Sequence, residues 1–271
     1  MDTSHFIAGT TGGMGGVIVG HPFDTIRVKM QTQQLYNTYR NPLHCCLKVL
    51  KSDGIRKGLY KGALSPLIGN TIFKTVNFGV YGNLLEKLEK TNDYGIIMNS
   101  IAAGTISSQV CGLILIPIDR VKILLQTHQH LQSINSVISR LTLSKLLKTG
   151  FTSTMARESM FGMTYFPLYQ TTKWIVQNAT PESDNSFIVS AISGGITGSL
   201  SWSIVFPFDV VKSKIQSELV EHNTFIDTVK NHYRKEGVKG FYKGWRAAVY
   251  RAFPTHATVL GLYQLTINRL R

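Results

Sequence analysis

Three ten-residue segments place a proline, an acid, a base and a glutamine at one fixed spacing. They read PFDTIRVKMQ from Pro22, PIDRVKILLQ from Pro117 and PFDVVKSKIQ from Pro207. In each segment the acid and the base are three residues apart, so they occupy neighbouring positions on one helix face. The prolines also predict kinks, because proline removes a backbone hydrogen bond inside a helix.

The shared spacing predicts a ring of ion pairs between successive segments. A local pair on a solvated helix end would contribute little and would not require the same register three times. Such a ring closes one end of a central cavity and opens at modest cost, so it is predicted to act as a gate. The expected pairs are Asp24 with Lys122, Asp119 with Lys212, and Asp209 with Arg27, and the glutamines able to hydrogen-bond across them are Gln31, Gln126 and Gln216.

A second set of ionisable residues lies within stretches that are otherwise almost uncharged. Arg157 and Arg251 each stand 12 residues before a tyrosine, Tyr169 and Tyr263. An ionisable residue at mid-membrane depth marks a functional site by default. Glu158 follows Arg157 directly, and sequence neighbours face each other poorly on a helix, so we expect the two side chains not to pair. The predicted substrate site comprises Asn70, Lys74, Asn77, Arg157, Glu158 and Arg251, with Trp202 as a further candidate.

These side chains suit a cargo that carries both a carboxylate and an amine. Arg157 or Arg251 can hold a carboxylate through two parallel hydrogen bonds, and Glu158 can hold an ammonium. Two roles are open for Trp202: a cation–π surface for a quaternary amine, or a packing or lipid-facing ring. Because the cations of the site outnumber its single acid, keto acids or other organic acids are the alternative cargo.

Composition leaves two broad classes of protein. The 271 residues carry 29 lysines and arginines against 15 acids, a formal net charge of +14, yet only 16% are charged and 43% are hydrophobic. A typical soluble domain has about 25% charged residues. The values favour a basic nucleic-acid-binding protein or a membrane protein with basic loops. Nucleotide-binding, hydrolase and metalloprotease motifs do not occur, so we expect neither an enzyme nor a cofactor or metal site.

The distribution of charge favours the membrane class. A membrane-spanning helix needs about 20 mostly apolar residues, and six stretches near that length carry at most two charged side chains each. The basic residues gather between the stretches rather than on one accessible face, which argues against nucleic-acid binding. The six stretches are residues 6–23, 62–85, 94–118, 149–172, 185–208 and 247–268.

A threefold internal repeat organises the chain. The three prolines are 95 and 90 residues apart, and small residues stand 13 and nine positions before each of them, a spacing that lets helix backbones approach closely. We predict an all-α membrane protein of six tilted spans, with short surface helices near residues 43–51, 134–147 and 225–235. The predicted repeats are 1–92, 93–181 and 182–271, and the small residues are Gly9 and Gly13, Gly104 and Ser108, Gly194 and Gly198.

The three proline segments resemble the signature of the mitochondrial carrier family, and the resemblance covers the whole chain. It implies six tilted transmembrane helices in threefold pseudosymmetry, alternating access and the mitochondrial inner membrane. The ring is then the matrix-side gate, and the three glutamines are its braces. One position departs from the signature: its second base, present as Lys29 and Lys214, is Leu124 in the middle repeat.

The resemblance implies a second gate, on the cytosolic side, made from an aromatic-acid-x-x-base motif on the even-numbered helices. The matching positions contain no acid, and only one keeps its base. We expect this gate to depend on tyrosine, glutamine and apolar contacts, and uniport to compete with strict exchange. The matching positions read Tyr81-Gly82 with Leu85, Tyr169-Gln170 with Lys173, and Tyr263-Gln264 with Ile267.

The segments Tyr60-Lys61-Gly62 and Tyr242-Lys243-Gly244 resemble the family's cardiolipin sites. Free N–H groups at a helix N-terminus and the helix dipole favour a phosphate, with a basic residue beside it. Simple snorkelling of Lys61 and Lys243 to the interface is the alternative. The expected partners are a membrane lipid and a small metabolite, without nucleic acid, and the protein is expected to be a monomer.

The resemblance also suggests a branch of the family. Arg157-Glu158 and the run Arg251-Ala252-Phe253-Pro254 are similar to the branch that carries amino acids and carnitine esters. The first repeat supplies no second acid, so zwitterions are favoured over strongly dibasic substrates.

Overall fold

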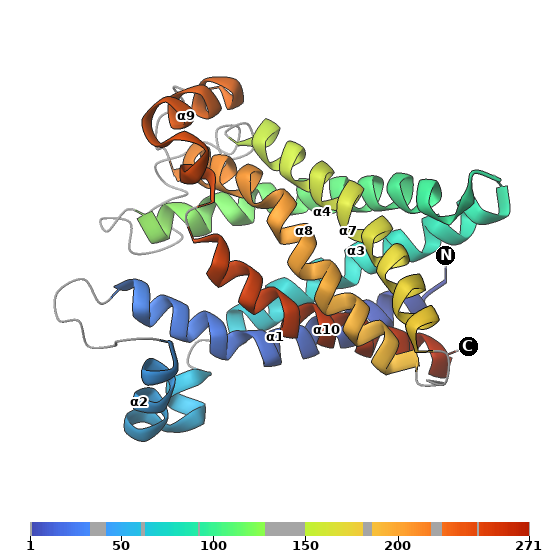
Figure 1. Cartoon of the computed structure of the whole chain (residues 1–271), viewed down its shortest axis with the longest axis horizontal. Coiled ribbons are helices and arrows are strands. Elements are labelled where there is room, and N and C mark those ends of the chain that lie inside the picture. The colour runs from blue at the N-terminus through green and yellow to red at the C-terminus, as the bar shows by residue number, and fades with distance from the viewer. Residues whose placement is uncertain are drawn as a thin grey trace. The chain divides into compact units, whose positions relative to one another are not determined.

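The computed structural model describes residues 2–32, 42–60, 63–91, 93–127, 150–180, 186–217, 224–242 and 244–270. Within these ranges the chain is all-helical, without a strand (Figure 1). Six of the helices are long, and they contain most of the six predicted spans, which confirms the predicted fold class. The long helices are α1 (Ser4–Thr32), α3 (Leu64–Thr91), α4 (Gly95–Thr127), α7 (Phe151–Ala179), α8 (Ser186–Ser217) and α10 (Trp245–Leu270).

Two of the three predicted surface helices are present. Helix α2 (Pro42–Gly54) is followed by the short π-helix η1 (Ile55–Leu59), and α9 (Phe225–Phe241) continues across a kink at Gly237. Gly54 and Gly237 have φ angles of 71° and 62°, in the left-handed region that favours glycine. These glycines therefore let both segments change direction at the same point of the repeat. The third predicted surface helix, residues 134–147, lies outside the described residues.

The proline segments lie inside helices rather than at their ends. Pro22 is within α1, which continues to Thr32, and Pro207 is within α8, which continues to Ser217. The acid and the base that follow each proline are therefore placed by helical geometry. The side chain of Pro117, in α4, lies outside the described part.

Hydropathy alone identifies only part of this architecture. Among the described residues, Gly95–Ile114 of α4 and Ser186–Gln216 of α8 are long and apolar enough to cross a membrane, with mean hydropathies of 1.3 and 1.4. The other long helices carry more polar and charged residues, which lowers their mean hydropathy.

The contacts divide the chain into two compact units. Unit 1 comprises Met1–Glu86, Leu168–Leu200 and Arg246–Arg271, and unit 2 comprises Lys87–Pro167 and Ser201–Trp245. Helices α3, α7, α8 and α10 contribute residues to both units, whereas α1 lies in unit 1 and α4 in unit 2. Each group of side chains below is therefore assigned to its own unit.

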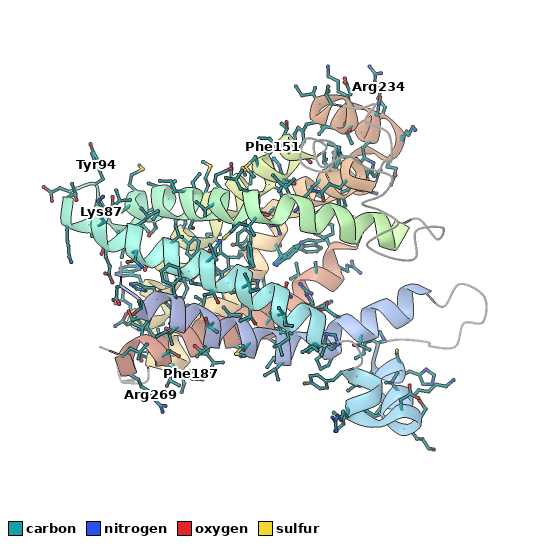
Figure 2. All side chains as sticks on the ribbon, turned by 180° about the vertical axis from the view of Figure 1, so that it is seen from behind. Lys87, Tyr94, Phe151, Phe187, Arg234 and Arg269 are labelled. Atoms are coloured by element: carbon teal, nitrogen blue, oxygen red, sulfur yellow. The ribbon has the colours of Figure 1, made fainter. Side chains whose placement is uncertain are left out.

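In unit 1, α1 packs against two helices through small residues. A Cβ atom added to Gly9 would lie 2.8 Å from the carbonyl oxygen of Lys74 in α3, and one added to Gly12 would lie 2.6 Å from that of Val259 in α10. The start of α8 meets the end of α10, where Asn268 Nδ2 donates to Ser186 Oγ at 2.7 Å. Figure 2 shows the neighbouring Phe187 and Arg269 at that same end of unit 1.

In unit 2, the backbones of α4 and α7 touch. A Cβ atom on Gly104 would lie 2.6 Å from the carbonyl oxygen of Gly162, and a Cβ atom on Gly162 would lie 2.2 Å from that of Gly104. Further along α4, Gly112 meets Met155 and Glu158, which precede Gly162 on α7, so the two helices run antiparallel.

The predicted close approach of the small-residue pairs is confirmed in all three repeats. Each pair faces the second long helix of its own repeat, and each would be obstructed by a larger side chain on either member. The contacts are Gly9 and Gly13 with Lys74, Gly104 and Ser108 with Gly162, and Gly194 and Gly198 with His256.

Candidate substrate site and gates

Four charged side chains of α7 and α8 form a cluster in unit 2. Glu158 is completely buried, and its Oε1 accepts a hydrogen bond from Arg157 Nη1 and lies 4.0 Å from Lys212 Nζ. Arg157 Nε lies 3.5 Å from Oδ1 of Asp209. The expectation that Arg157 and Glu158 do not pair was therefore wrong: both long side chains bend toward α8, where Asp209 and Lys212 complete the cluster.

The second carboxylate oxygen of Glu158 is available. Oε2 is buried and has no hydrogen-bond partner among the described residues. A buried carboxylate oxygen without a donor is costly. Since an ionised carboxylate only accepts hydrogen bonds, this atom suits an ammonium group of a ligand.

The aromatic residues around Arg157 hold its guanidinium group. The group lies over the ring of Phe161 at 5.4 Å and over that of Trp202 at 5.9 Å. Planar guanidinium groups stack favourably on aromatic faces. The ring face of Trp202 lies beside Arg157, a cation of the protein itself. Binding of a quaternary amine to this ring stays a prediction.

In unit 1, Arg251 of α10 binds an acid of the predicted matrix gate. Arg251 Nη1 donates to Asp24 Oδ1 of α1, and both side chains are about one third exposed. On α3, Lys74 Nζ lies over the rings of Phe73 and Phe78 at 5.7 and 5.6 Å. Unit 1 therefore presents a partly solvated arginine whose present partner is a carboxylate.

The two predicted asparagines of α3 differ in their surroundings. Asn77 is 2% exposed, and its Nδ2 has no hydrogen-bond partner within the described ranges. Asn70, two helical turns earlier, is exposed. Asn77 is thus the better placed of the two to contact a ligand from a buried position.

The acids of the predicted matrix gate have partners that the sequence did not suggest. Asp24 binds Arg251 and Asp209 contacts Arg157, where Lys122 and Arg27 were expected. The cause is that each site arginine lies within reach of the acid on a neighbouring long helix. The ring itself stays a prediction, because the side chains of Arg27, Asp119 and Lys122 lie outside the described part.

The described glutamine of this gate also has a different partner. Gln216 is completely buried, and its Nε2 donates to Thr154 Oγ1 at 2.9 Å. It therefore ties α8 to the first turn of α7 rather than spanning an acid–base pair. Gln31 and Gln126 lie outside the described side chains.

The second base of the third segment connects α8 to α9. Lys214 Nζ lies 2.5 Å from His232 Nδ1 and 3.5 Å from Glu236 Oε1.

The six residues of the predicted cytosolic gate come together in unit 1. Gln170 Nε2 donates to the hydroxyl of Tyr81 at 3.2 Å, and Lys173 Nζ donates to Gln264 Oε1 at 3.1 Å. Lys173 also lies 5.9 Å from the ring centre of Tyr169. These bonds connect α3, α7 and α10 through hydroxyl, amide and ammonium groups, with Tyr263 packed on Phe78 at 4.8 Å.

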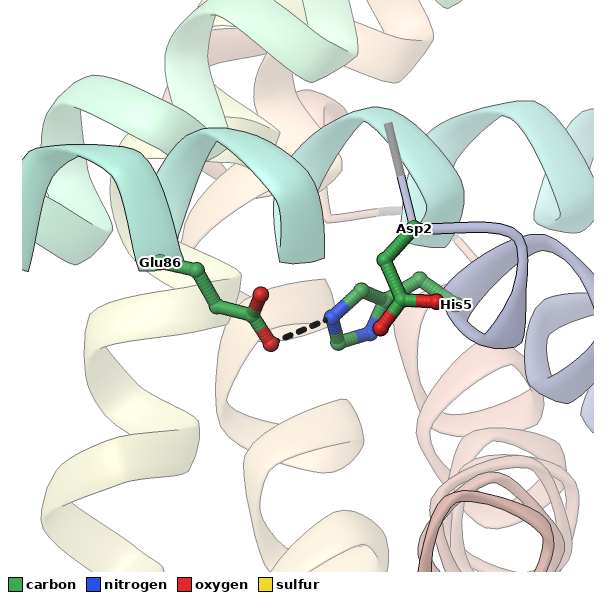
Figure 3. A group of neighbouring side chains, drawn as sticks. All are labelled: Asp2, His5 and Glu86. Atoms are coloured by element: carbon green, nitrogen blue, oxygen red, sulfur yellow. Dashed lines mark hydrogen bonds and ion pairs between the residues drawn. The ribbon is translucent and has the colours of Figure 1, made fainter. Parts of the chain in front are cut away.

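Two residues at this end of unit 1 were not predicted. His5 of α1 faces Glu86 of α3 (Figure 3), and its other ring nitrogen contacts Tyr263 of α10. Sequence reasoning missed them because Glu86 lies five positions beyond the tyrosine of its motif and His5 belongs to no motif.

The predicted lipid-binding tyrosines each contact the first long helix of their repeat. The hydroxyl of Tyr60 donates to the carbonyl oxygen of Ile18 at 2.8 Å, and the ring of Tyr242 stacks on Phe206 at 6.5 Å. Gly244 has a φ of 91°, which requires glycine. Lys61, Gly62 and Lys243 lie outside the described residues.

An apolar recess of about 400 Å³ lies beside Tyr242, between α8 and α9. The described residues of its walls carry no charged side chain, so this part of the recess suits a hydrocarbon chain better than a headgroup. It is lined by Pro207, Phe208, Val211, Phe225, Val229, Val238, Phe241 and Tyr242.

Comparison with known proteins identifies the family. The sequence matches the family described as mitochondrial carrier protein over residues 3–92, 96–180 and 183–271. The "Mitochondrial basic amino acids transporter" of Bos taurus is 31% identical over 98% of this chain and 92% of its own length. The "Mitochondrial magnesium exporter 1" of Drosophila melanogaster is 32% identical (98% and 94%), and the "Mitochondrial carnitine carrier" of Saccharomyces cerevisiae is 30% identical (95% and 85%).

The three consecutive matches and the long helices define a transporter built from three repeats. The chain belongs to the mitochondrial carrier family, and it is a multi-pass protein of the mitochondrial inner membrane. The named cargoes of its relatives differ from one another, so the cargo of this chain must be argued from its own site.

Proposed function

We propose that the protein carries a small metabolite with both a carboxylate and an amine, amino-acid-like or carnitine-like, by alternating access across the inner membrane. The observation that supports this cargo is the cluster around Glu158. Its buried Oε2 lacks a donor among the described residues, while Arg157 on the same helix offers a guanidinium group. An ammonium on Glu158 and a carboxylate on Arg157 would satisfy both charges of a zwitterion.

Transport in this proposal needs no catalytic residue, cofactor or resident metal ion. The lipid that we expect beside it is cardiolipin, and the recess next to Tyr242 supports that expectation through its apolar lining. We also propose that the carrier works as a monomer.

The alternative cargo is a keto acid or another organic acid. It is favoured by the two cations beside Glu158, Arg157 and Lys212, whose charges are balanced within the cluster only when Asp209 also stays in place. In that case Glu158 would serve only to hold the two cations in place, and its charge would not contact the cargo.

Uptake by the purified chain in proteoliposomes separates these cargoes. The panel comprises neutral and basic amino acids, carnitine, acylcarnitines, 2-oxo acids and Mg²⁺. We expect uptake of compounds that carry both an amine and a carboxylate. Uptake of 2-oxo acids alone would favour the alternative, and transport of Mg²⁺ alone would refute both proposals.

Glu158→Gln tests the role of the carboxylate, because glutamine keeps the size of the side chain. A hydrogen bond to a charged group is worth about 1.5–3 kcal/mol, so KM for amine-bearing substrates should rise about 10- to 100-fold. Glu89→Gln, an exposed acid on α3, is the control and should leave uptake unchanged. Unaltered kinetics of Glu158→Gln would contradict the site assignment.

A further inference from the structure

His5, in the first turn of α1, connects three helices of unit 1. Its Nε2 lies 2.8 Å from Glu86 Oε1 of α3, and its Nδ1 lies 2.7 Å from the hydroxyl of Tyr263 of α10. The dashed line in Figure 3 marks the contact with Glu86. An ionised carboxylate only accepts hydrogen bonds, so in this contact Nε2–H is the donor and Glu86 Oε1 is the acceptor. The side chain of His5 is 7% exposed, so the imidazole is buried, while that of Glu86 is 31% exposed.

The start of α1 is fixed in the position that this bridge requires. The backbone N–H of Ser4, the first residue of α1, donates to Asp2 Oδ1 at 2.9 Å. Asn83 Nδ2 of α3 donates to the carbonyl oxygen of Asp2 at 3.0 Å. The first turn of α1 is thus held on α3, which restricts where the imidazole of His5 can point.

The imidazole fills a space that Gly82 leaves open. Gly82 follows Tyr81 at the position where the family motif has an acid, and a Cβ atom there would lie 2.3 Å from His5 Nδ1 and 2.4 Å from its Cγ. Glu86 stands four residues later, on the same face of α3. The first repeat therefore lacks an acid at the motif position but has one a turn further on. His5 contacts both this acid and Tyr263, and so connects them.

We propose that His5 is a positioning residue of the cytosolic gate. It joins Tyr263 to Glu86, and Glu86 takes the place of the acid that the first repeat lacks at the motif position. This rests on the proposed transport function, since a gate has meaning only in a transporter. If α3 and α10 separate at this end when the gate opens, one imidazole cannot keep both hydrogen bonds. The bridge consequently favours the closed gate.

The same residues also raise the question of a metal ion. One donor atom each of Asp2, His5 and Glu86 lie within 4.8 Å of one another. Both ring nitrogens of His5, however, already have hydrogen-bond partners. The bridge accounts for the cluster without an ion.

The close contact between Gly82 and His5 can be tested by thermal unfolding in detergent. Gly82→Ala should lower Tm in the wild-type background, because its Cβ meets a ring that is packed on Tyr263. In the His5→Ala background the same substitution should have no effect on Tm or raise it. An equal loss of Tm in both backgrounds would overturn the packing on which the proposal depends.

The gating role can be tested by cysteine labelling, which needs no substrate and so does not depend on the cargo assignment. Asn77→Cys, buried on α3, is introduced into a chain whose Cys45, Cys46 and Cys111 are replaced, and a membrane-impermeant thiol reagent is added from the cytosolic side. His5→Phe removes both hydrogen bonds of the imidazole and should speed labelling about fivefold. Glu86→Gln keeps an acceptor oxygen but removes the carboxylate charge, so it weakens the bond from Nε2 and should speed labelling by a smaller factor.

Two further variants make the labelling result decisive. Glu89→Gln, three residues beyond Glu86 and exposed, should leave the rate unchanged. Exchange of the pair, His5→Glu with Glu86→His, should return the rate toward that of the parent, whereas either single exchange should not. Equal labelling of the parent, His5→Phe and Glu86→Gln would overturn the proposal.

Discussion

At the scale of single residues, the same pairing occurs once in each unit. Arg251 binds Asp24 in unit 1 and Arg157 contacts Asp209 in unit 2. Each arginine belongs to the predicted substrate site, and each acid belongs to the predicted matrix gate. In the first repeat the position that corresponds to the two arginines is Gly69, which cannot form such a pair. A substrate carboxylate would therefore compete with a gate acid for its arginine.

Asp24→Asn tests this competition. Removing the acid frees Arg251 for the substrate carboxylate, and KM should fall about two- to fivefold, the range for a partly exposed ion pair. The maximal rate should fall as well, because the predicted matrix gate loses one of its acids. Uptake kinetics in proteoliposomes measure both quantities.

The control for this prediction is a matched cargo. A transported amine without a carboxylate should show no fall in KM in Asp24→Asn, since it does not use Arg251. A KM that stays constant for carboxylate-bearing substrates would show that Asp24 and the substrate do not share the arginine.

At the scale of helices, close backbone contact was the feature that the sequence predicted best. The spacing of small residues before each proline predicted the contact of Gly104 with the second long helix of its repeat. The acid–base pairing was predicted less well. The spacing of Asp24 and Arg27 shows that they share a helix face, but it does not show how far each helix is shifted along its neighbour. That shift decides which cation reaches Asp24, and it depends on packing along the whole helix.

Gly162→Val tests the contact of α4 with α7. The added side chain would meet the carbonyl group of Gly104, which cannot move away by changing rotamer. Overpacking of this kind costs about 1–3 kcal/mol, so we expect a fall of several degrees in Tm in detergent. Gly69→Ala, on α3 with no other group near its Cβ position, is the control and should keep or raise Tm. Equal Tm values for the two variants would contradict the contact.

At the scale of the whole molecule, the overall architecture was predicted mainly from the threefold internal repeat. The six nearly uncharged stretches predicted the long helices, and the three copies of the proline segment grouped them into repeats with a surface helix in each. Helices α2 and α9 are present, and the family comparison covers the same three repeats. The bridge through His5 could not be predicted in this way. Its contacts join residue 5 to residues 86 and 263, and of these three residues only Tyr263 belongs to a repeated motif.

The composition of the predicted cytosolic gate leads to a prediction about the mode of transport. The described bonds across it include Gln170 with Tyr81 and Lys173 with Gln264, and neither is an ion pair. A neutral hydrogen bond contributes about 0.5–1.5 kcal/mol net and one from an ammonium group about 1.5–3 kcal/mol. We infer that the gate opens without a bound substrate often enough for uniport. We therefore expect uptake into vesicles that contain no counter-substrate, and its complete absence would show strict exchange.

Gln264→Glu makes this prediction specific to the gate. The new carboxylate would face Lys173 Nζ, which now donates to the Gln264 amide oxygen at 3.1 Å, and would convert a hydrogen bond into an ion pair. Uptake without counter-substrate should then fall severalfold more than exchange does. Adding Lys173→Met removes the cation and should reverse that selective loss, because the acid at position 264 then has no lysine to bind. If the single and the double variant lose both modes equally, the strength of this contact does not set the balance between uniport and exchange.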